Sequence, residues 1–144
     1  MHDNPFASYN VTIPRRYADD VKTFTQTSGS RVTEMFAPFK RQVDFWYLAF
    51  IYAVHKNLKP ESIDDSSNIT PASILSTDPY RIIHIQLAFL GEFLDIDKLS
   101  DSKKVFDYAI QMANAGIPYI LQMLKDQDAR PLENILDFLE GEDS

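Results

Sequence analysis

Residues 43–54 form the most apolar stretch of the chain, with the one tryptophan, four further aromatic residues and a single charged residue near the start. A helix on a protein surface shows a wide polar stripe at a spacing of three to four residues, and this stretch shows almost none. We therefore predict a central buried helix over about residues 39–57. Ala49 and Ala53 lie four residues apart, so one face of this helix is small enough for a neighbouring helix to approach closely.

A second apolar helix is predicted over residues 79–94. Asp78 supplies an N-cap carboxylate, and Pro79 suits the first helical position. One stripe of this helix is apolar and contains Ile83, Leu87, Leu90 and Leu94, widened by Ile82, Phe89 and Phe93. The opposite stripe is mostly polar and contains Arg81, His84, Ala88, Glu92 and Asp95. We expect the apolar stripe to pack on the central helix, which makes Arg81, His84 and Glu92 candidate partner-binding residues.

The other helices are predicted to be shorter. An extended piece at residues 11–13 precedes a helix at residues 15–24, and a later helix begins near Ser100. Gly116 is free to take a left-handed cap that ends this later helix, and Pro118 then opens another short helix. One longer helix that is kinked at Pro118 is the alternative.

The last predicted helix begins at Pro131 and has acidic residues on the side opposite its apolar stripe. The stripe consists of Leu132, Ile135, Leu136 and Leu139. Such a helix either docks into the groove of a partner or closes its own domain, and domain closure is the commoner use. These four residues are a second candidate partner-binding surface.

Residues 58–77 are the longest part of the chain without a pattern, with two prolines and five serines. A disordered or plain connecting segment accounts for this composition better than a binding loop does. Residues 1–10 are predicted to be a flexible arm, and residues 141–144 an acidic tail. The predicted fold class is all-α, a compact bundle of five to seven helices in a single domain over residues 11–140.

The charge is unevenly distributed. The net charge is −7; residues 1–60 carry eight Lys/Arg against five Asp/Glu (+3), and residues 61–144 carry six against sixteen (−10). The overall field repels nucleic acid. Ordinary solvated charge is the commoner explanation of such an asymmetry, but a basic face in the N-terminal half stays open. That face would consist of Arg15, Arg16, Lys40 and Arg41.

The chain shows no pattern for secretion or for a membrane span. Its first residues lack a basic and an apolar region, and residues 43–54 fall short of the roughly 20 apolar residues that a spanning helix needs. The sequence has no cysteine, which removes disulfides and thiolate metal sites and fits a reducing compartment. We predict a soluble cytoplasmic protein that does not contact a membrane.

No motif for catalysis or for cofactor binding stands out. The three histidines have no metal-ligand spacing, and the four glycines lie too far apart for a phosphate-binding loop. No spacing of nucleophile, base and acid indicates a catalytic triad. We predict no enzyme activity, no metal and no cofactor.

Three segments of the chain carry a resemblance to other proteins. They read P-F-K-R-Q-V-D-F-W at residues 38–46, D-P-Y-R-I-I-H-I-Q-L-A-F-L at residues 78–90 and Y-A-I-Q-M-A-N-A-G-I at residues 108–117. With the leucine-rich terminal helix, this order resembles the small accessory proteins encoded beside bacterial DNA phosphorothioation (Dnd-type) systems, over about residues 11–140. The resemblance implies a bacterial, non-catalytic subunit of a defence system that recognises foreign DNA. It assigns no catalytic residue, and residues 58–77 depart from its pattern.

Two hypotheses of function result. The first is a non-catalytic accessory or adaptor subunit of a bacterial anti-phage or anti-plasmid defence complex, which binds a larger protein such as an ATPase or a nuclease. The second is a nucleic-acid-binding module that uses the basic N-terminal residues. A homo-oligomer also stays open, because two nearly all-apolar helices in 144 residues leave few elements to cover them. In that case the central helix owes part of its cover to a second chain.

Overall fold

The structure of the chain is a computed structural model that describes residues 3–26, 35–126 and 130–142, with side chains described as far as residue 140. The elements follow in the order β1 (Asn10–Pro14), the 3₁₀ helix η1 (Arg15–Tyr17), α1 (Ala18–Thr23), α2 (Gln42–His55), β2 (Ser66–Pro71), η2 (Ala72–Thr77), α3 (Pro79–Phe93), η3 (Ile96–Ser100), α4 (Ser102–Leu124) and α5 (Pro131–Glu142). Most described residues are helical, and one two-stranded sheet accompanies the helices. The prediction of an all-α fold is therefore correct only in the coarser sense of a helix-dominated fold. Residues 1–2 of the predicted arm and residues 143–144 of the predicted tail lie outside the described part.

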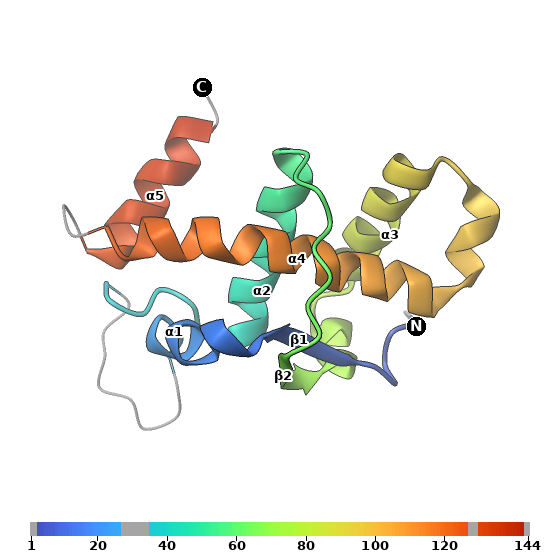
Figure 1. The fold of residues 1–144 in the computed structure, drawn as a ribbon, viewed down its shortest axis with the longest axis horizontal. Coiled ribbons are helices and arrows are strands. Elements are labelled where there is room, and N and C mark those ends of the chain that lie inside the picture. Colours follow the sequence, from blue (N-terminus) through green and yellow to red (C-terminus); the bar gives the residue numbers. More distant parts are fainter. Residues whose placement is uncertain (1–2, 27–34, 127–129, 143–144) are drawn as a thin grey trace.

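The central element is α2, as the apolar pattern predicts (Figure 1). None of its residues from 42 to 54 is exposed, and Trp46 and Phe50 are fully buried. α4 packs against α2 at Gly116, where an added Cβ would lie 2.1 Å from the carbonyl oxygen of Ala49. The close helix approach predicted at Ala49 is thus confirmed, and it requires a glycine on the facing helix.

The longest helix, α4, runs without interruption through Gly116 and Pro118. The helix end predicted at Gly116 is wrong, and the alternative of one longer helix is correct. Tertiary contact overrides the local signal here, because this glycine provides space for α2 rather than a left-handed turn. The N-cap of the helix is Asp101, whose carboxylate accepts a hydrogen bond from the backbone N–H of Lys104 at 3.2 Å. The cap therefore lies one residue after the predicted Ser100.

The small sheet joins the two ends of the first half of the chain. β2 pairs antiparallel with β1, in a register that runs from Asn10 opposite Pro71 to Pro14 opposite Ser66. Every second residue of β1 points to the core, because alternate side chains of a strand face opposite sides. Val11 and Ile13 are accordingly fully buried. The irregular segment predicted over residues 58–77 is therefore wrong from Ser66 onwards.

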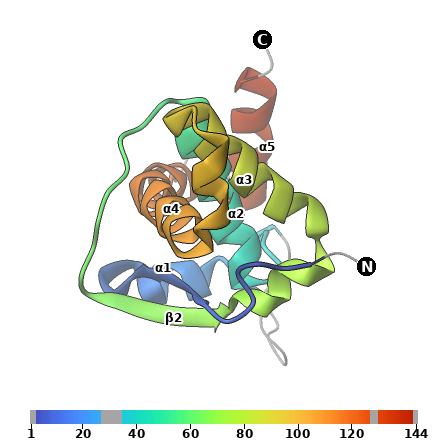
Figure 2. The same cartoon turned by 90° about the vertical axis from the view of Figure 1, so that its right-hand side faces the viewer.

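Before β2, the chain passes round α4 as an extended segment (Figure 2). The backbone N–H of Glu61 donates to the carbonyl of Gln111 at 3.0 Å, and the side-chain amide of Asn114 donates to the carbonyl of Glu61 at 3.0 Å. Asn114 is buried, so this hydrogen bond satisfies a polar group inside the protein. The segment is therefore fastened to α4 although it has no regular structure.

The N-terminal residues are packed rather than loose from Asn4 onwards. The Phe6 ring is buried and lies 5.2 Å from the Phe106 ring of α4. The Asn4 side-chain amide donates to the carbonyl of Ala72 at 3.0 Å. The flexible arm predicted over residues 1–10 is therefore corrected for the part that the structure describes.

Candidate interaction surface

α3 lies at one end of the molecule, with α5 at the other (Figure 1). Its buried residues are Arg81, Ile82, Ile85 and Phe89. Much of the stripe that was expected to face the core is instead exposed, with exposed fractions of 51% for Ile83, 58% for Leu87 and 84% for Leu94. The predicted orientation is therefore wrong for these three residues, whereas Ile82 and Phe89, which were expected to widen the stripe, are buried. Tyr80, with an exposed fraction of 49%, also lies at the surface, and Arg81 faces the core.

Four charged side chains hold α3 in this orientation. The carboxylate of Asp44, in the first turn of α2, accepts hydrogen bonds from Arg81 at 3.0 Å and from Arg41 at 2.8 Å. Arg41 also donates to the carboxylate of Asp78, the N-cap residue of α3, at 2.8 Å. We call these four residues the charge clamp, because they join the starts of α2 and α3. Two cations meet two anions, so the clamp is neutral overall.

Arg81 is buried because its charge has a partner on α2 and an aromatic ring beneath it. Its guanidinium carbon lies 4.4 Å from the centre of the Tyr47 ring, a cation–π contact. An unpaired arginine in this place would be strongly unfavourable. The pairing with Asp44 is therefore what allows α3 to turn this face inwards.

The sequence contains a signal for the clamp that its hydrophobic pattern hides. Asp44 is the one charged residue in the apolar stretch 43–54, and Arg81 is the one charged residue between positions 79 and 91. Buried charges need a partner of opposite sign. Two lone opposite charges in two apolar helices are therefore expected to meet, and here they do.

The ion pairs of the clamp fix the charge of its members. The hydrogen bond from Arg41 holds the pKa of Asp78 below its ordinary value. Hydrogen bonds to Asp44 and Asp78 raise the pKa of Arg41 further above neutrality. Arg41 and Asp78 thus stay charged around neutral pH. The clamp is suited to holding two helices together rather than to transferring protons.

Three aromatic rings cover the outer side of the clamp. The Tyr47 hydroxyl is hydrogen-bonded to Nδ1 of His84, and their rings stack with centroids 6.0 Å apart. Tyr80 packs edge-on against both rings. Burial raises the pKa of Tyr47 above its ordinary value, so its phenol remains neutral. These contacts connect the clamp to the exposed surface of α3.

A set of large apolar residues on the outer side of α3 and at its C-cap follows a regular spacing. They are Tyr80, Ile83, Leu87, Leu90 and Leu94, which we call the α3 stripe. Successive members are 3, 4, 3 and 4 positions apart, the spacing by which one helix packs along another. Leu90 is half-buried and the others are exposed. From position 80 to position 91 the one charged residue is the buried Arg81, so the surface of the stripe is uncharged.

The α3 stripe is large for an uncovered apolar surface. A tyrosine side chain has roughly 150–250 Å² of surface, and leucine and isoleucine side chains are smaller, on the order of 150 Å². The exposed fractions of the stripe therefore leave about 450 Å² of apolar surface on one face of α3. The largest apolar patch of an ordinary monomer covers about 300–600 Å² and often has a function. The stripe is in that range and is the candidate interaction surface.

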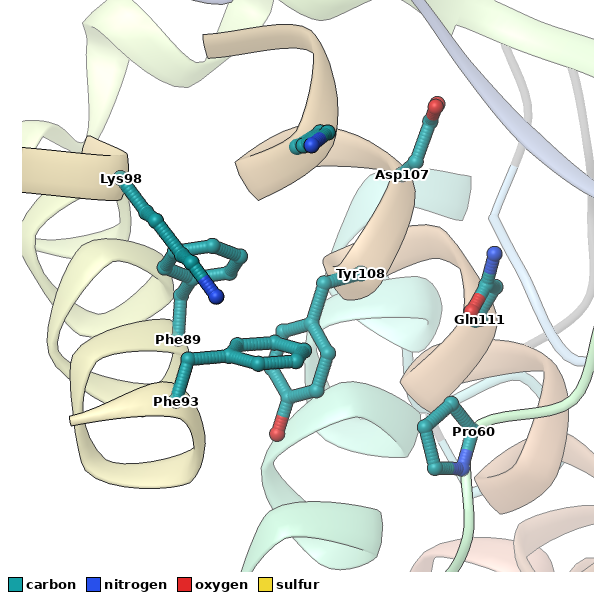
Figure 3. A pocket seen from close by; sticks show the side chains of 8 residues that line it. Pro60, Phe89, Phe93, Lys98, Asp107, Tyr108 and Gln111 are labelled. Atoms are coloured by element: carbon teal, nitrogen blue, oxygen red, sulfur yellow. The ribbon is translucent and has the colours of Figure 1, made fainter. Parts of the chain in front are cut away.

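A cavity of about 390 Å³ lies between the end of α3, η3 and α4 (Figure 3). Phe89, Phe93 and Tyr108 line it, with ring centroids 4.6 to 5.8 Å apart. Lys98 reaches over the Phe93 ring, with its Nζ 5.6 Å from the ring centre. Burial raises the pKa of Tyr108, so its hydroxyl stays neutral. The cavity is therefore walled mainly by aromatic rings, with a lysine at its edge.

The polar residues of α3 that were predicted to bind a partner have different environments. Arg81 lies inside the charge clamp, with 9% of the residue exposed. His84 is exposed beside Tyr80. Glu92 is exposed and lines a neighbouring cavity of about 480 Å³. His84 and Glu92 are therefore accessible to a partner, and Arg81 is not.

The terminal helix α5 is divided between core and surface. Ile135 is buried, and the half-buried Leu132 donates its backbone N–H to the carbonyl of Met35 at 2.9 Å. Leu136 and Leu139 are exposed, with fractions of 50% and 41%. Two of the four residues predicted as a second partner-binding surface are therefore accessible, and their exposed area is smaller than that of the α3 stripe.

The basic residues of the nucleic-acid hypothesis do not form a group of unpaired cations. Arg15 donates to the carboxylate of Asp65 at 2.7 Å, and Arg41 belongs to the charge clamp. Arg16 lies over a tyrosine ring, and Lys40 is exposed. Carboxylates thus already meet two of the four positive charges. This arrangement weakens the hypothesis of a phosphate-binding face.

Within the part of the chain that the structure describes, no group of three or more His, Asp or Glu side chains is arranged to hold a metal ion. In the same part, no helix has the length and apolar character needed to cross a membrane. No protein family model, no curated protein and no solved structure matches the chain significantly.

Proposed function

We propose that this protein is a non-catalytic interaction subunit that binds a protein partner through the α3 stripe. The observation that carries the proposal is the orientation of α3, which turns Arg81 inwards and leaves Ile83 and Leu87 exposed. Contact of these side chains with water is unfavourable, and covering a leucine or isoleucine fully gains about 1.5–3 kcal/mol. A partner on the stripe would recover part of this free energy for each of its residues.

The chemistry of the stripe indicates the kind of surface that fits it. A helix with its own apolar stripe, or an apolar groove, would match the 3-4-3-4 spacing. The stripe is uncharged between positions 80 and 91, so the contact itself is hydrophobic. Interactions of this kind depend weakly on salt compared with charge-steered ones.

The resemblance to accessory proteins of phosphorothioation systems adds a biological setting to the proposal. It would place the assembly formed by this subunit in the bacterial cytoplasm, in a defence complex with a larger ATPase or nuclease. Joint expression with the products of neighbouring genes tests this setting. A stable complex with one of them is the expected result, and purification of this chain free of all of them would contradict it.

Site-specific crosslinking tests the use of the α3 stripe. A photoreactive residue at position 87 is expected to crosslink a protein inside cells, and the same residue at position 136 of α5 serves as the control. Leu87 and Leu136 are leucines of similar exposure on different helices. The crosslinked protein would then be purified, and Leu87→Glu should weaken its binding at least tenfold while Leu136→Glu leaves it unchanged. Equal crosslinking from both positions, or binding that Leu87→Glu does not affect, would refute the proposal.

A further inference from the structure

We infer that the partner on the α3 stripe is a second copy of this chain, packed antiparallel across a two-fold axis at Leu87. The inference rests on the proposed function, because it takes the α3 stripe as a docking surface. Gly91 and Leu94 support the inference, because both residues suit a monomer poorly. The residues that an antiparallel arrangement brings together and the lack of charge at its centre support it as well.

No contact within the described chain requires a glycine at position 91, which lines the cavity of about 480 Å³ beside Leu87 and Glu92. It is an exposed residue inside α3, where alanine would favour the helix. A Cβ added to it would meet no atom of a neighbouring part of the chain within 4 Å. Gly116 differs, since its missing side chain is required by the contact with α2. The missing side chain of Gly91 is explained when another chain approaches α3 closely at this point.

Leu94 is the second residue that suits a monomer poorly. It caps α3 in the left-handed conformation, with φ 55° and ψ 34°, a region that favours glycine. It also has the largest exposed fraction, 84%, among the exposed large hydrophobic residues of the described chain. An unfavourable backbone conformation is thus combined with an apolar side chain in water. Burial of this side chain by a second chain accounts for the leucine.

An antiparallel arrangement about Leu87 pairs part of the stripe with itself and places Leu90 of one copy opposite His84 of the other. When two copies of α3 pack antiparallel about Leu87, Tyr80 of one copy lies opposite Leu94 of the other. Ile83 of one copy then lies opposite Gly91 of the other. The branched isoleucine therefore meets the one position of the face that has no side chain. A two-fold axis produces each of these contacts twice, as in most homodimers.

The charge distribution also favours a second copy. Two chains of net charge −7 repel each other at a distance, so acidic residues at the contact would oppose association. The exposed residues of α3 from position 80 to position 91 carry no charge, so the centre of the contact contains no opposing groups, and the exposed Glu92 lies towards its end. Because salt screens the overall repulsion, added salt is expected to strengthen this dimer. A basic partner would show the opposite dependence.

The size of the stripe agrees with a specific dimer. The apolar surface of about 450 Å² per copy would form the greater part of the contact, since interfaces are roughly 55–65% apolar. The complete interface would then bury about 1,500 Å² in total, close to the usual size of a specific complex. The inference therefore predicts a reversible dimer.

Sedimentation equilibrium of the purified full chain tests the inference. We expect a monomer–dimer equilibrium at protein concentrations of about 1–200 μM, the weak end of the affinities that interfaces of this size show. Leu87→Glu places two carboxylates at the two-fold axis and should raise the dissociation constant at least tenfold. The control Leu136→Glu should behave as the wild type. Raising the salt concentration should lower the dissociation constant of the wild type.

Crosslinking through an introduced cysteine locates the axis, because the natural chain has no cysteine. Leu87→Cys should form disulfide-linked dimers at protein concentrations where Leu136→Cys does not. A chain that stays monomeric throughout the range overturns the inference, as does a dimer that Leu87→Glu leaves intact. If the chain is monomeric while position 87 crosslinks a different protein in cells, the second copy is refuted and the proposed function stands. If neither is observed, both are refuted.

Discussion

α2 and α3 have similar apolar sequences but differ in what covers them. No residue of α2 from position 42 to position 54 is exposed, because α1, α3, α4, α5 and β2 surround it. α3 exposes seven of its fifteen residues. An apolar sequence thus indicates that the surface of a helix needs to be buried. It does not indicate whether the same chain or another one buries it. The expectation that the central helix needs a second chain is wrong for α2, and the uncovered stripe belongs to α3.

The largest expected effect concerns the covered helix. Phe50→Ala removes a fully buried ring from α2 and should lower the free energy of unfolding by about 3–5 kcal/mol. Urea unfolding of the wild type and the variant measures this difference. Leu87→Ala is the matched change on the exposed stripe of α3 and should have an effect within about 0.5 kcal/mol for the monomer. Similar losses in the free energy of unfolding for both variants would contradict the conclusion that α2 is buried while the stripe of α3 is exposed.

Two isoleucines compare the two faces of α3 directly. Ile85 is fully buried and Ile83 is about half exposed, although they lie two positions apart on one helix. Ile85→Ala should lower the free energy of unfolding by about 2–5 kcal/mol. Ile83→Ala should lower it by less than about 1 kcal/mol when the protein is dilute enough to be monomeric. A larger loss for Ile83→Ala would show that α3 is turned as its sequence pattern first suggested.

The hydrophobic pattern predicts the elements better than their orientation. It places the central helix, the helix after Asp78 and the terminal helix close to where they are observed. It fails for the direction of α3, because it treats Arg81 as a surface residue and the charge clamp lies between residues far apart in sequence. It also fails for β2, because this mostly polar segment forms a strand only through pairing with β1. Local patterns do not contain such long-range pairings.

The clamp should make stability depend on pH. The folded-state pKa of Asp78 is below its ordinary value of 3.8, so the unfolded chain binds the proton more readily. The contribution of this residue to stability is therefore fully present above about pH 3.8, and it is lost as the pH falls through the folded-state pKa. Asp78→Asn should lower stability at neutral pH and flatten the loss of stability on acidification. Unfolding curves at a series of pH values test this, and an unchanged slope would show that Arg41 does not hold the carboxylate.

Leu94→Gly should change the stability of the monomer and the strength of dimerisation in opposite directions. Glycine adopts the left-handed backbone of position 94 more readily than leucine, so the melting temperature of the dilute monomer should rise slightly. The same change removes the most exposed side chain of the α3 stripe and should weaken the dimer several-fold. Calorimetry of dilute protein and sedimentation of concentrated protein measure the two effects. A lower melting temperature of the dilute monomer together with an unchanged dissociation constant of the dimer would contradict both expectations.

The most direct measurement is the effect of Gly91→Ala on stability and association together. Alanine should stabilise the helix of the dilute monomer by about 0.5–1 kcal/mol, which corresponds to a rise of roughly 2–4 °C in melting temperature. The added methyl group meets nothing in the described chain, but it would occupy the space that Ile83 of the second copy needs. We therefore predict a more stable monomer whose dimerisation is at least tenfold weaker. A variant that is more stable and dimerises as well as the wild type would contradict the claim that α3 is shaped for a second chain.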